Sequence, residues 1–458
     1  MQERVPVPDS EINRELLSSV ETHPKWWFLT VAVLALIVAT AGGALGWMIN
    51  QGLGVTGLNR PVMWGFFIAN FVFWVGISHA GVMISSILRL SQAEWRRPVT
   101  RAAEVLTIFS LMTAALFPLM HAGRPWRIAY WIFPYDFARG IWPNVRSPLV
   151  WDPSAIFTYL TGATLFVFIA LIPDLAVMRD RSTGVRKQIY GILALGFRGT
   201  PRQWRLQAIA GILLSALILP VFVSVHSIVS WDFGMAISVA SWHTTVMAPY
   251  FVIGAVHSGV SAVVTMMALL RWVFKWDKFI RPEHFDGLAR LLVVVGTAWF
   301  YFFILEFLFG LYSQEASEVT LRNMLLYEWP WNFMFVIFLV TSYFIPIPMW
   351  LFRGVRRNIL LMFLTSILVN IGMWLERFLI IIPGLMRKQE FTFVWANYRP
   401  SVVEILLVVG SFAFVAMMVL LFSKVFPLIP LFDQKEGKVL EATTRVGRRN
   451  VPSIVREE

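Results

Sequence analysis

The sequence predicts an all-α integral membrane protein with about ten transmembrane helices. Of its 458 residues, 57% are hydrophobic and only 14% are charged, whereas a soluble protein carries about a quarter charged residues. Aromatic residues make up 15% of the chain and include 21 Trp, which fits a protein that lines two membrane–water interfaces. The chain therefore has more apolar side chains than a water-soluble core can bury.

Ten segments each contain the roughly 20 largely apolar residues that a helix needs to cross a bilayer. All are predicted to be helical, because an isolated apolar run satisfies its backbone hydrogen bonds in lipid only as a helix. The first 24 residues are polar and of mixed charge, unlike a signal peptide, so the apolar run from Trp26 is expected to be retained as the first span. The predicted spans are 26–50, 62–89, 102–122, 153–178, 206–229, 245–270, 291–312, 331–352, 358–383 and 401–423.

The basic residues concentrate in alternate loops. If the N-terminus is inside, the inner loops hold most of the loop Lys and Arg residues, and the positive-inside rule then places both termini in the cytoplasm of a bacterial inner membrane. This loop charge accounts for the net charge of +12 without nucleic-acid binding. Arg101 is assigned to the loop before span three, which leaves Arg377 as the only Lys or Arg predicted within a span.

Spans two and six share a short motif. Residues 76–82 read GISHAGV and residues 254–260 read GAVHSGV. Both spans are predicted to run in the same direction, so the match indicates a four-helix unit that is repeated in parallel topology, with spans one and ten beside the two bundles. The predicted divisions are 1–25 (cytoplasmic segment), 26–61 (first span and outer loop), 62–230 (bundle one, spans two to five), 231–383 (bundle two, spans six to nine), 384–423 (outer loop and tenth span) and 424–458 (basic cytoplasmic tail).

The motif histidines, His79 and His257, are predicted to lie near the middle of the membrane. Three interpretations stay open: buried histidines bonded to their neighbours, ligands of a b-type haem, or members of a proton relay. Ionisable groups at this depth are costly and usually functional. The predicted proton path joins them to carboxyl groups on either side and consists of His79, Glu104, Asp174, His257, Glu306 and Glu376.

Redox centres are not expected on this chain. It has no cysteine, which removes thiolate-held iron–sulfur clusters and covalently attached c-type haem. No predicted span contains two histidines, whereas a di-haem cytochrome normally places a histidine pair on each of two helices. A secondary transporter would more often have broken helices at the midplane of the membrane. Here the clearest polar cluster is predicted at the outer ends of the spans, which favours a site that faces an external partner.

This outer cluster combines histidine, carboxyl and guanidinium groups. Asp152 has an alternative role as the N-cap of span four, with Pro153 at the first helical position. Arg377 has an alternative role in a structural ion pair, and His121 and His226 are also compatible with a position facing the membrane surface. The cluster comprises His121 at the end of span three, Asp152 at the start of span four, His226 in span five, Glu306 in span seven, and Glu376 and Arg377 in span nine.

Quinol oxidation is a reaction that this combination fits. It releases two protons and two electrons and needs an apolar slot with a histidine and a carboxylate near the hydroxyl groups as proton acceptors. The chain has no redox centre of its own unless it binds haem, so the electrons are expected to pass to a partner docked on the outer face.

Three segments resemble a known family. They are Trp231-Asp232-Phe233, the run Trp242 to Thr245 ahead of Pro249-Tyr250-Phe251, and Asn370 to Phe378. They are similar to the NrfD-like, polysulfide-reductase-type membrane subunits and, within that family, to the large quinol-oxidising membrane subunit of alternative complex III. The molybdopterin-oxidoreductase membrane anchors of the polysulfide-reductase type are the alternative within the family.

The resemblance implies a substrate, partners and a site. Menaquinol or ubiquinol would be oxidised near the outer face, and electrons would pass to a peripheral iron–sulfur subunit and c-type cytochrome subunits, beside a second, similar membrane subunit. It also implies proton-conducting half-channels. The matching catalytic positions are His121, Asp152 and Arg377, with Asp136 as an alternative to Asp152 in the same loop. The predicted quinone-binding residues are His121, Arg124, Asp152, His226, Asp232, Trp374, Glu376 and Arg377.

Overall fold

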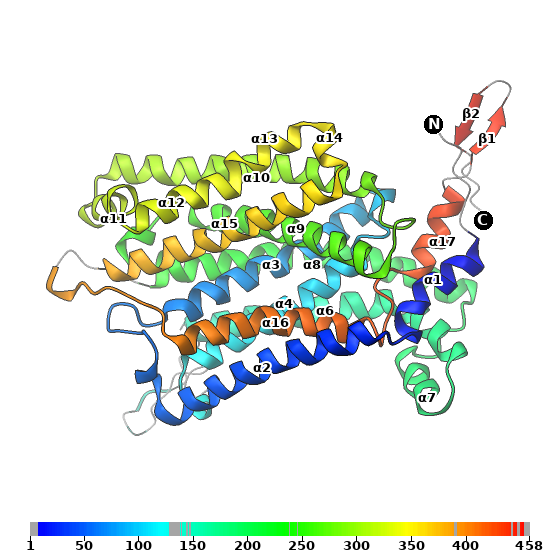
Figure 1. The fold of residues 1–458 in the computed structure, drawn as a ribbon, viewed down its shortest axis with the longest axis horizontal. Coiled ribbons are helices and arrows are strands. Elements are labelled where there is room, and N and C mark those ends of the chain that lie inside the picture. Colours follow the sequence, from blue (N-terminus) through cyan, green and yellow to red (C-terminus); the bar gives the residue numbers. More distant parts are fainter. Residues whose placement is uncertain are drawn as a thin grey trace.

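The computed structural model describes residues 8–127, 138, 140–142, 145, 148–237, 239–244, 246–388, 392–440, 443–446 and 449–452. Within these ranges, ten helices are long and apolar enough to cross a membrane, in agreement with the predicted number of spans. The helices run along the long axis of the molecule, and both chain ends lie at the same end (Figure 1). We call this the termini end. We call the opposite end, where the short helix α11 (Ala316–Tyr327) lies, the far end.

Two spans contain a π-helical turn. Span five is α8 (Pro201–Trp231) followed by the turn η5 (Asp232–Ala236), and span eight is α12 (Trp331–Leu339), the turn η7 (Val340–Phe344) and α13 (Pro346–Leu351). The remaining spans are α2 (Lys25–Gln51), α3 (Gly65–Leu90), α4 (Thr100–His121), α6 (Pro148–Arg181), α9 (Met247–Phe274), α10 (Pro282–Ser313), α15 (Ile359–Met386) and α16 (Val402–Phe422).

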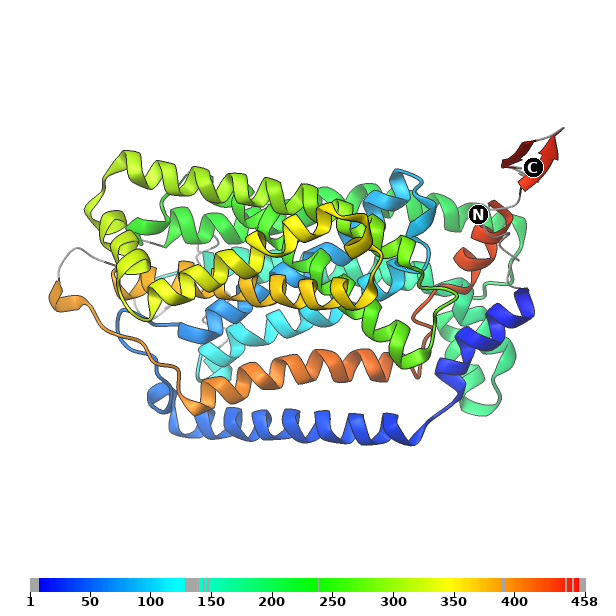
Figure 2. The same ribbon diagram turned by 45° about the horizontal axis from the view of Figure 1, so that its top comes forward.

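The spans pack in two groups around a central pair. In the first group α3, α4, α6 and α8 contact one another in a ring, and in the second group α9 and α15 pack with α10 and with the segments of span eight. The helices α3 and α9 join the two groups at the centre, and α2 lies with α16 along one side of the molecule (Figures 1 and 2). These groups contain the helices expected for the two bundles; the exact divisions of the chain stay a prediction.

The shared glycine motif lies where the central helices meet. A Cβ atom at Gly76 of α3 would be 3.5 Å from the hydroxyl of Ser258 on α9, and one at Gly259 of α9 would collide with Ala80 of α3. A Cβ atom at Gly81 would collide with the backbone of Ala103 on α4. Small residues of this kind allow membrane helices to approach closely, so the motif brings α3 against both α4 and α9.

Short elements cover the termini end. The N-terminal helix α1 (Asp9–Glu21) buries Ile12, Leu16 and Val20, which recur at helical spacing on one face. The loop helix α7 (Gly184–Leu193) and the C-terminal helix α17 (Leu431–Leu440) lie at the same end (Figure 1). The strands β1 (Thr443–Val446) and β2 (Arg449–Pro452) form an antiparallel hairpin in the tail, which the sequence did not predict.

The remaining elements are single turns in the connections. A helix of one turn, α14, follows span eight at residues Arg353–Arg356. The others are turns of 3₁₀ helix: η1 (Leu53–Val55), η2 (Glu94–Arg96), η3 (Pro125–Arg127), η6 (Ala240–Trp242) and η8 (Thr392–Val394).

A buried carboxyl group joins two connections at the far end. Glu404, in the first turn of α16, accepts hydrogen bonds from the backbone N–H of Gly57 at 2.7 Å and from the hydroxyl of Tyr398 at 2.5 Å. Burial raises the pKa of Tyr398, which keeps its hydroxyl a donor. The connection after α2 is thereby tied to the connection before α16.

Candidate functional site

Two aspartates from different spans meet at the far end. Asp152 lies on α6, and Asp232 begins the π-helical turn η5 that follows α8. Asp232 is 2% exposed, and the two carboxyl groups lie within hydrogen-bonding reach of each other. Oδ1 of Asp152 and both carboxyl oxygens of Asp232 accept no hydrogen bond from the described residues. Buried oxygens without donors are costly, so this pair is a candidate binding and proton-accepting site.

The local backbone explains how the pair forms. The helix α6 begins at Pro148, so Asp152 lies inside the helix; the alternative in which Asp152 caps it and Pro153 occupies the first position is wrong. Pro153 follows inside the helix, beyond its first turn, where a proline removes one backbone hydrogen bond. Trp231, the last residue of α8, is 50% exposed, whereas the next residue, Asp232, is buried in the wider turn. Such π-helical turns often occur at functional sites.

The other predicted residues of this end differ in exposure. His121 is the last residue of α4 and is half-buried, and Arg124 is exposed just beyond it. The helices α4 and α6 are neighbours, so His121 and Asp152 lie at the same end of adjacent helices. Asp136 lies outside the described residues.

Arg377 faces the protein interior. It is 2% exposed; its Nε lies 3.6 Å from Oε2 of Glu376, and its Nη2 donates to the carbonyl oxygen of Phe251 at 3.4 Å. The guanidinium also lies over the Phe251 ring, 4.2 Å from its centroid, which adds a cation–π attraction. The contacts of the two predicted catalytic residues thus differ. Asp152 has Asp232 as its neighbour, whereas Arg377 contacts α9 and Glu376.

A second line of buried groups runs through the centre of the molecule. His226 is fully buried, and its ring centroid lies 4.5 Å from that of His79 and 6.2 Å from that of Phe251. The ring nitrogens of His79 face two carbonyl oxygens, that of Val75 at 2.5 Å and that of Phe222 at 3.2 Å. This bonding fits the interpretation as a buried, backbone-bonded histidine, and the closeness of His226 also fits a relay.

The second motif histidine has different neighbours. Nε2 of His257 lies 3.1 Å from the carbonyl oxygen of Ser342, in the π-helical turn of span eight, and its ring stacks on Trp299. Trp299 in turn donates its indole N–H to Glu376 at 2.8 Å. His257 is thus connected through one tryptophan to Glu376 and then to Arg377.

Two further predicted residues have polar partners near the far end. Glu306 accepts a hydrogen bond from the hydroxyl of Thr244 at 2.7 Å. Trp374 is half-buried and donates its indole N–H to Asn70 of α3 at 2.9 Å. Trp374 therefore packs toward α3, while Arg377, one turn later, contacts α9.

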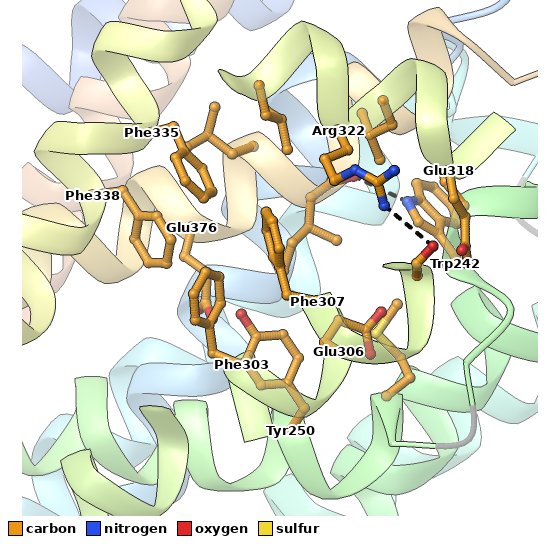
Figure 3. A pocket seen from close by; sticks show the side chains of 17 residues that line it. Trp242, Tyr250, Phe303, Glu306, Phe307, Glu318, Arg322, Phe335, Phe338 and Glu376 are labelled. Carbon is orange, nitrogen blue, oxygen red and sulfur yellow. Dashed lines mark hydrogen bonds between the residues drawn. The ribbon is translucent and has the colours of Figure 1, made fainter. Parts of the chain in front are cut away.

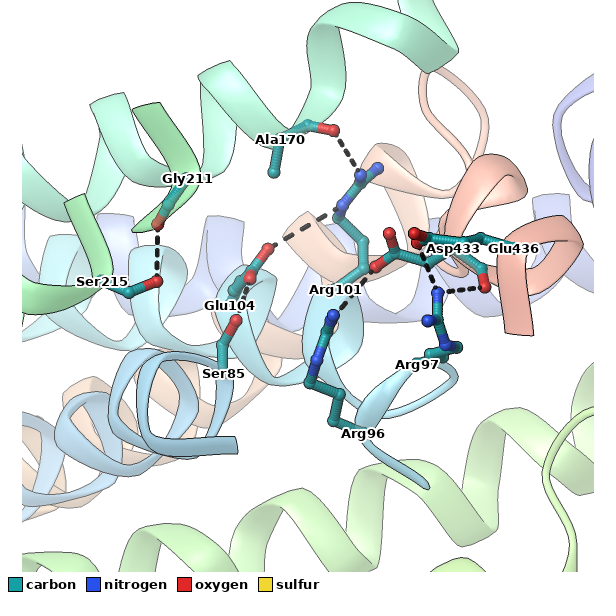
Figure 4. Close-up of polar contacts among 10 residues, drawn as sticks. All are labelled: Ser85, Arg96, Arg97, Arg101, Glu104, Ala170, Gly211, Ser215, Asp433 and Glu436. Carbon is teal, nitrogen blue, oxygen red and sulfur yellow. Dashed lines mark hydrogen bonds and ion pairs between the residues drawn. The ribbon is translucent and has the colours of Figure 1, made fainter. Parts of the chain in front are cut away.

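A buried charge cluster lies at the termini end. Arg101 is 1% exposed and pairs with Asp174 at 3.1 Å. It also pairs with Glu104 at 3.9 Å and donates to the carbonyl oxygen of Ala170 at 2.9 Å (Figure 4). The prediction that Arg377 is the only Lys or Arg within a span is therefore wrong. The helix α4 begins at Thr100, before its apolar run, which places Arg101 inside the span.

The C-terminal segment covers this cluster. The backbone N–H of Leu431 donates to Asp174 at 3.3 Å, and the carbonyl oxygen of Pro427 accepts from Arg101 at 3.4 Å. Arg97 donates to Glu436 of α17 at 2.8 Å (Figure 4). The two carboxyl groups predicted for the inner part of a proton path, Glu104 and Asp174, are thus brought together by an arginine and capped by the tail.

Sequence reasoning missed three residues of these clusters. Arg101 was assigned to a loop because it lies at the predicted start of a span. An arginine within one turn of an apolar run is a signal that could have identified it as a residue of the span. Tyr250 lies within hydrogen-bonding reach of Glu376, and Trp299 bonds the same carboxyl. Neither aromatic residue could be identified from spacing, because its partner lies on another helix.

Three relatives match almost the whole chain. A Halobacterium salinarum protein, named as a membrane component of a dimethyl sulfoxide reductase, is 25% identical over 92% of this chain and 95% of its own length. A protein of Mesobacillus selenatarsenatis, named as a component of selenate reductase, is 23% identical over 89% and 95%. The Hdr-like menaquinol oxidoreductase integral membrane subunit of Archaeoglobus fulgidus is 22% identical over 88% and 94%.

The family assignment follows from a match that covers most of the spans. Residues 54–389, from the end of the first span to the end of the ninth, match the family described as polysulphide reductase, NrfD. The ten apolar helices agree with a multi-pass membrane protein. The chain belongs to the NrfD family.

Proposed function

We propose that this chain is the quinol-oxidising membrane subunit of an electron-transfer complex of the alternative complex III type. The observation that carries the proposal is the pair of the half-buried Asp152 and the buried Asp232: Oδ1 of Asp152 and both oxygens of Asp232 accept no hydrogen bond from the described residues. Such a pair is ready to accept hydrogen bonds from a ligand that brings its own hydroxyl groups. The name of the Archaeoglobus relative, a menaquinol oxidoreductase subunit, supports the same substrate class.

The proposed reaction divides its products between this chain and a partner. Each quinol loses two protons and two electrons and becomes a quinone. The carboxyl pair accepts a proton from one hydroxyl, and His121, on the adjacent helix, accepts the other; both are suitable general bases. The electrons pass to a redox centre of a peripheral iron–sulfur or c-type cytochrome subunit. Arg377 acts as a positioning residue, because its hydrogen bond to the Phe251 carbonyl and its contact with the Phe251 ring hold α15 against α9.

The proposed orientation puts the far end on the outer face of the membrane. The excess of Lys and Arg in the loops of the termini end supports cytoplasmic termini. Protons from the quinol are then released outward, and the electron-accepting partners dock on the outer side.

A second candidate function has specific support. Two of the relatives are named as components of dimethyl sulfoxide reductase and selenate reductase, which favours a membrane anchor that exchanges electrons with a molybdopterin-containing partner. Affinity purification of the tagged chain from its native membrane separates the two candidates. We expect iron–sulfur and c-haem subunits and a bound quinone; a molybdopterin subunit in their place would establish the second candidate.

The proposed proton path joins the termini-end cluster to the far end through the central histidines. The contact between His79 and His226 supports it. In vesicles that contain the complex, His79→Phe is expected to lower the number of protons moved per electron while turnover persists. The exposed His243 supplies a control, since His243→Phe should leave the ratio unchanged. An unchanged ratio in His79→Phe at retained turnover would mean that His79 is structural.

A further inference from the structure

The second helix group contains a pocket that is separate from the carboxyl pair. It lies at the far end, has a volume of about 130 Å³ and is lined by residues of α9, α10, α11, α12 and α15. Its walls are aromatic: Phe303, Phe307, Phe335 and Phe338 surround it, and Tyr250 lies beside them (Figure 3). Pockets with aromatic walls and a few fixed polar groups are typical of small-molecule sites.

The charged groups of this pocket are the carboxyl groups of Glu306, Glu318 and Glu376 and the guanidinium of Arg322, which donates to the carbonyl oxygen of Gly310 at 3.3 Å. Glu376, 1% exposed, uses Oε1 to accept from Trp299 at 2.8 Å, while its Oε2 accepts no hydrogen bond from the described residues and lies 3.6 Å from Nε of Arg377. Glu306 also faces the pocket (Figure 3) and accepts from Thr244. A carboxylate paired with a guanidinium accepts hydrogen bonds and donates none, so a ligand that reaches Oε2 of Glu376 is well matched if it brings a donor.

We infer that this pocket is a second ligand site, which binds the reduced, hydroxyl-bearing ring of a quinol. A flat aromatic ring stacks well between phenylalanines, and its two hydroxyl groups can donate to the free Oε2 of Glu376 and to Glu306, which already accepts from Thr244. An oxidised quinone presents carbonyl oxygens, and an acceptor that faces another acceptor leaves both unpaired. Because the carboxyl groups of the lining outnumber its guanidinium, Arg322, which already donates to the carbonyl oxygen of Gly310, the site favours the reduced form. The choice of a quinol as the ligand rests on the proposed function. The location of the pocket is independent of the carboxyl pair.

The decisive test counts binding sites. The purified complex, stripped of endogenous quinone, is titrated anaerobically with a short-tailed naphthoquinol and, separately, with the corresponding naphthoquinone, and bound ligand is measured by equilibrium dialysis. We expect two quinol sites per complex and weaker binding of the quinone at one of them. Phe303→Trp, which fills the pocket, should remove one site. Phe309→Trp provides the matched control, because Phe309 lies on the same helix and is 44% exposed.

A second variant keeps the test valid if Phe303→Trp disturbs folding. Glu306→Leu should lower quinol affinity at the second site at least about tenfold, since a hydrogen bond to a charged group contributes about 1.5–3 kcal/mol, and should change quinone affinity little. Equal numbers of quinol sites in Phe303→Trp and Phe309→Trp, or unchanged affinity in Glu306→Leu, would overturn the inference. Asp152→Asn separates the two proposals, because it should weaken the other site and leave this one intact.

Discussion

Asp152→Asn is expected to reduce quinol oxidation at least about a hundredfold in an assembled complex. The amide has nearly the shape of the carboxyl group but cannot accept a proton, and general-base help typically contributes 10²–10⁴-fold to a rate. His121→Ala should lower the same rate at least about tenfold. The measurement is anaerobic turnover of a quinol against the natural or an artificial electron acceptor.

The control for this experiment lies on the same helix. Asp180 is at the termini end of α6, is 66% exposed and pairs with Arg179, so Asp180→Asn should leave turnover unchanged. Full activity of an assembled Asp152→Asn complex would remove Asp152 from the site.

Arg377→Leu is expected to destabilise the protein strongly. The substitution removes the ion pair with Glu376, the contact with the Phe251 ring and the hydrogen bond to the Phe251 carbonyl. It leaves a carboxyl group buried beside an apolar side chain, and breaking one partner of a buried pair costs about 3–5 kcal/mol. The measurements are the amount of assembled complex and the midpoint of thermal unfolding in detergent.

Two further variants test the cause of this loss. Arg377→Lys keeps the charge but loses the planar guanidinium, so its stability should fall between those of the wild type and Arg377→Leu. Adding Glu376→Gln to Arg377→Leu should restore part of the stability, because the buried charge is then gone and an acceptor for Trp299 remains. Arg353→Leu, at an exposed position, should have little effect. Equal stability of Arg377→Leu and Arg353→Leu would contradict the account.

The membrane spans could be predicted because hydrophobicity along the chain is a local property. Each apolar run marks a helix wherever it packs, and the GISHAGV and GAVHSGV motifs also identified the two helices that meet at the centre. Helix ends were less certain. The backbone of α4 continues before its apolar run to include Arg101, and α6 begins before Asp152, because a helix can extend through polar residues that find partners in the folded protein.

The site could be predicted in its residue types but not in its pairings. The sequence identified Asp152 and Asp232 separately, whereas their contact depends on the π-helical turn after Trp231, for which the sequence has no simple signal. The pairing of Arg101 with Asp174 depends on the packing of α4 against α6, and its cover by Leu431 joins residues far apart in the chain. Side chains that meet through tertiary packing leave no periodicity in the sequence.

A double-mutant cycle on the carboxyl pair tests the central proposal most directly. Quinol turnover is measured for the assembled wild type, Asp152→Asn, Asp232→Asn and the double variant, with Asp180→Asn as control. If the two carboxyl groups act as one proton-accepting unit, each single variant loses most of the activity and the double variant is no slower than the slower single variant. Wild-type turnover in the assembled double variant would contradict quinol oxidation at this pair.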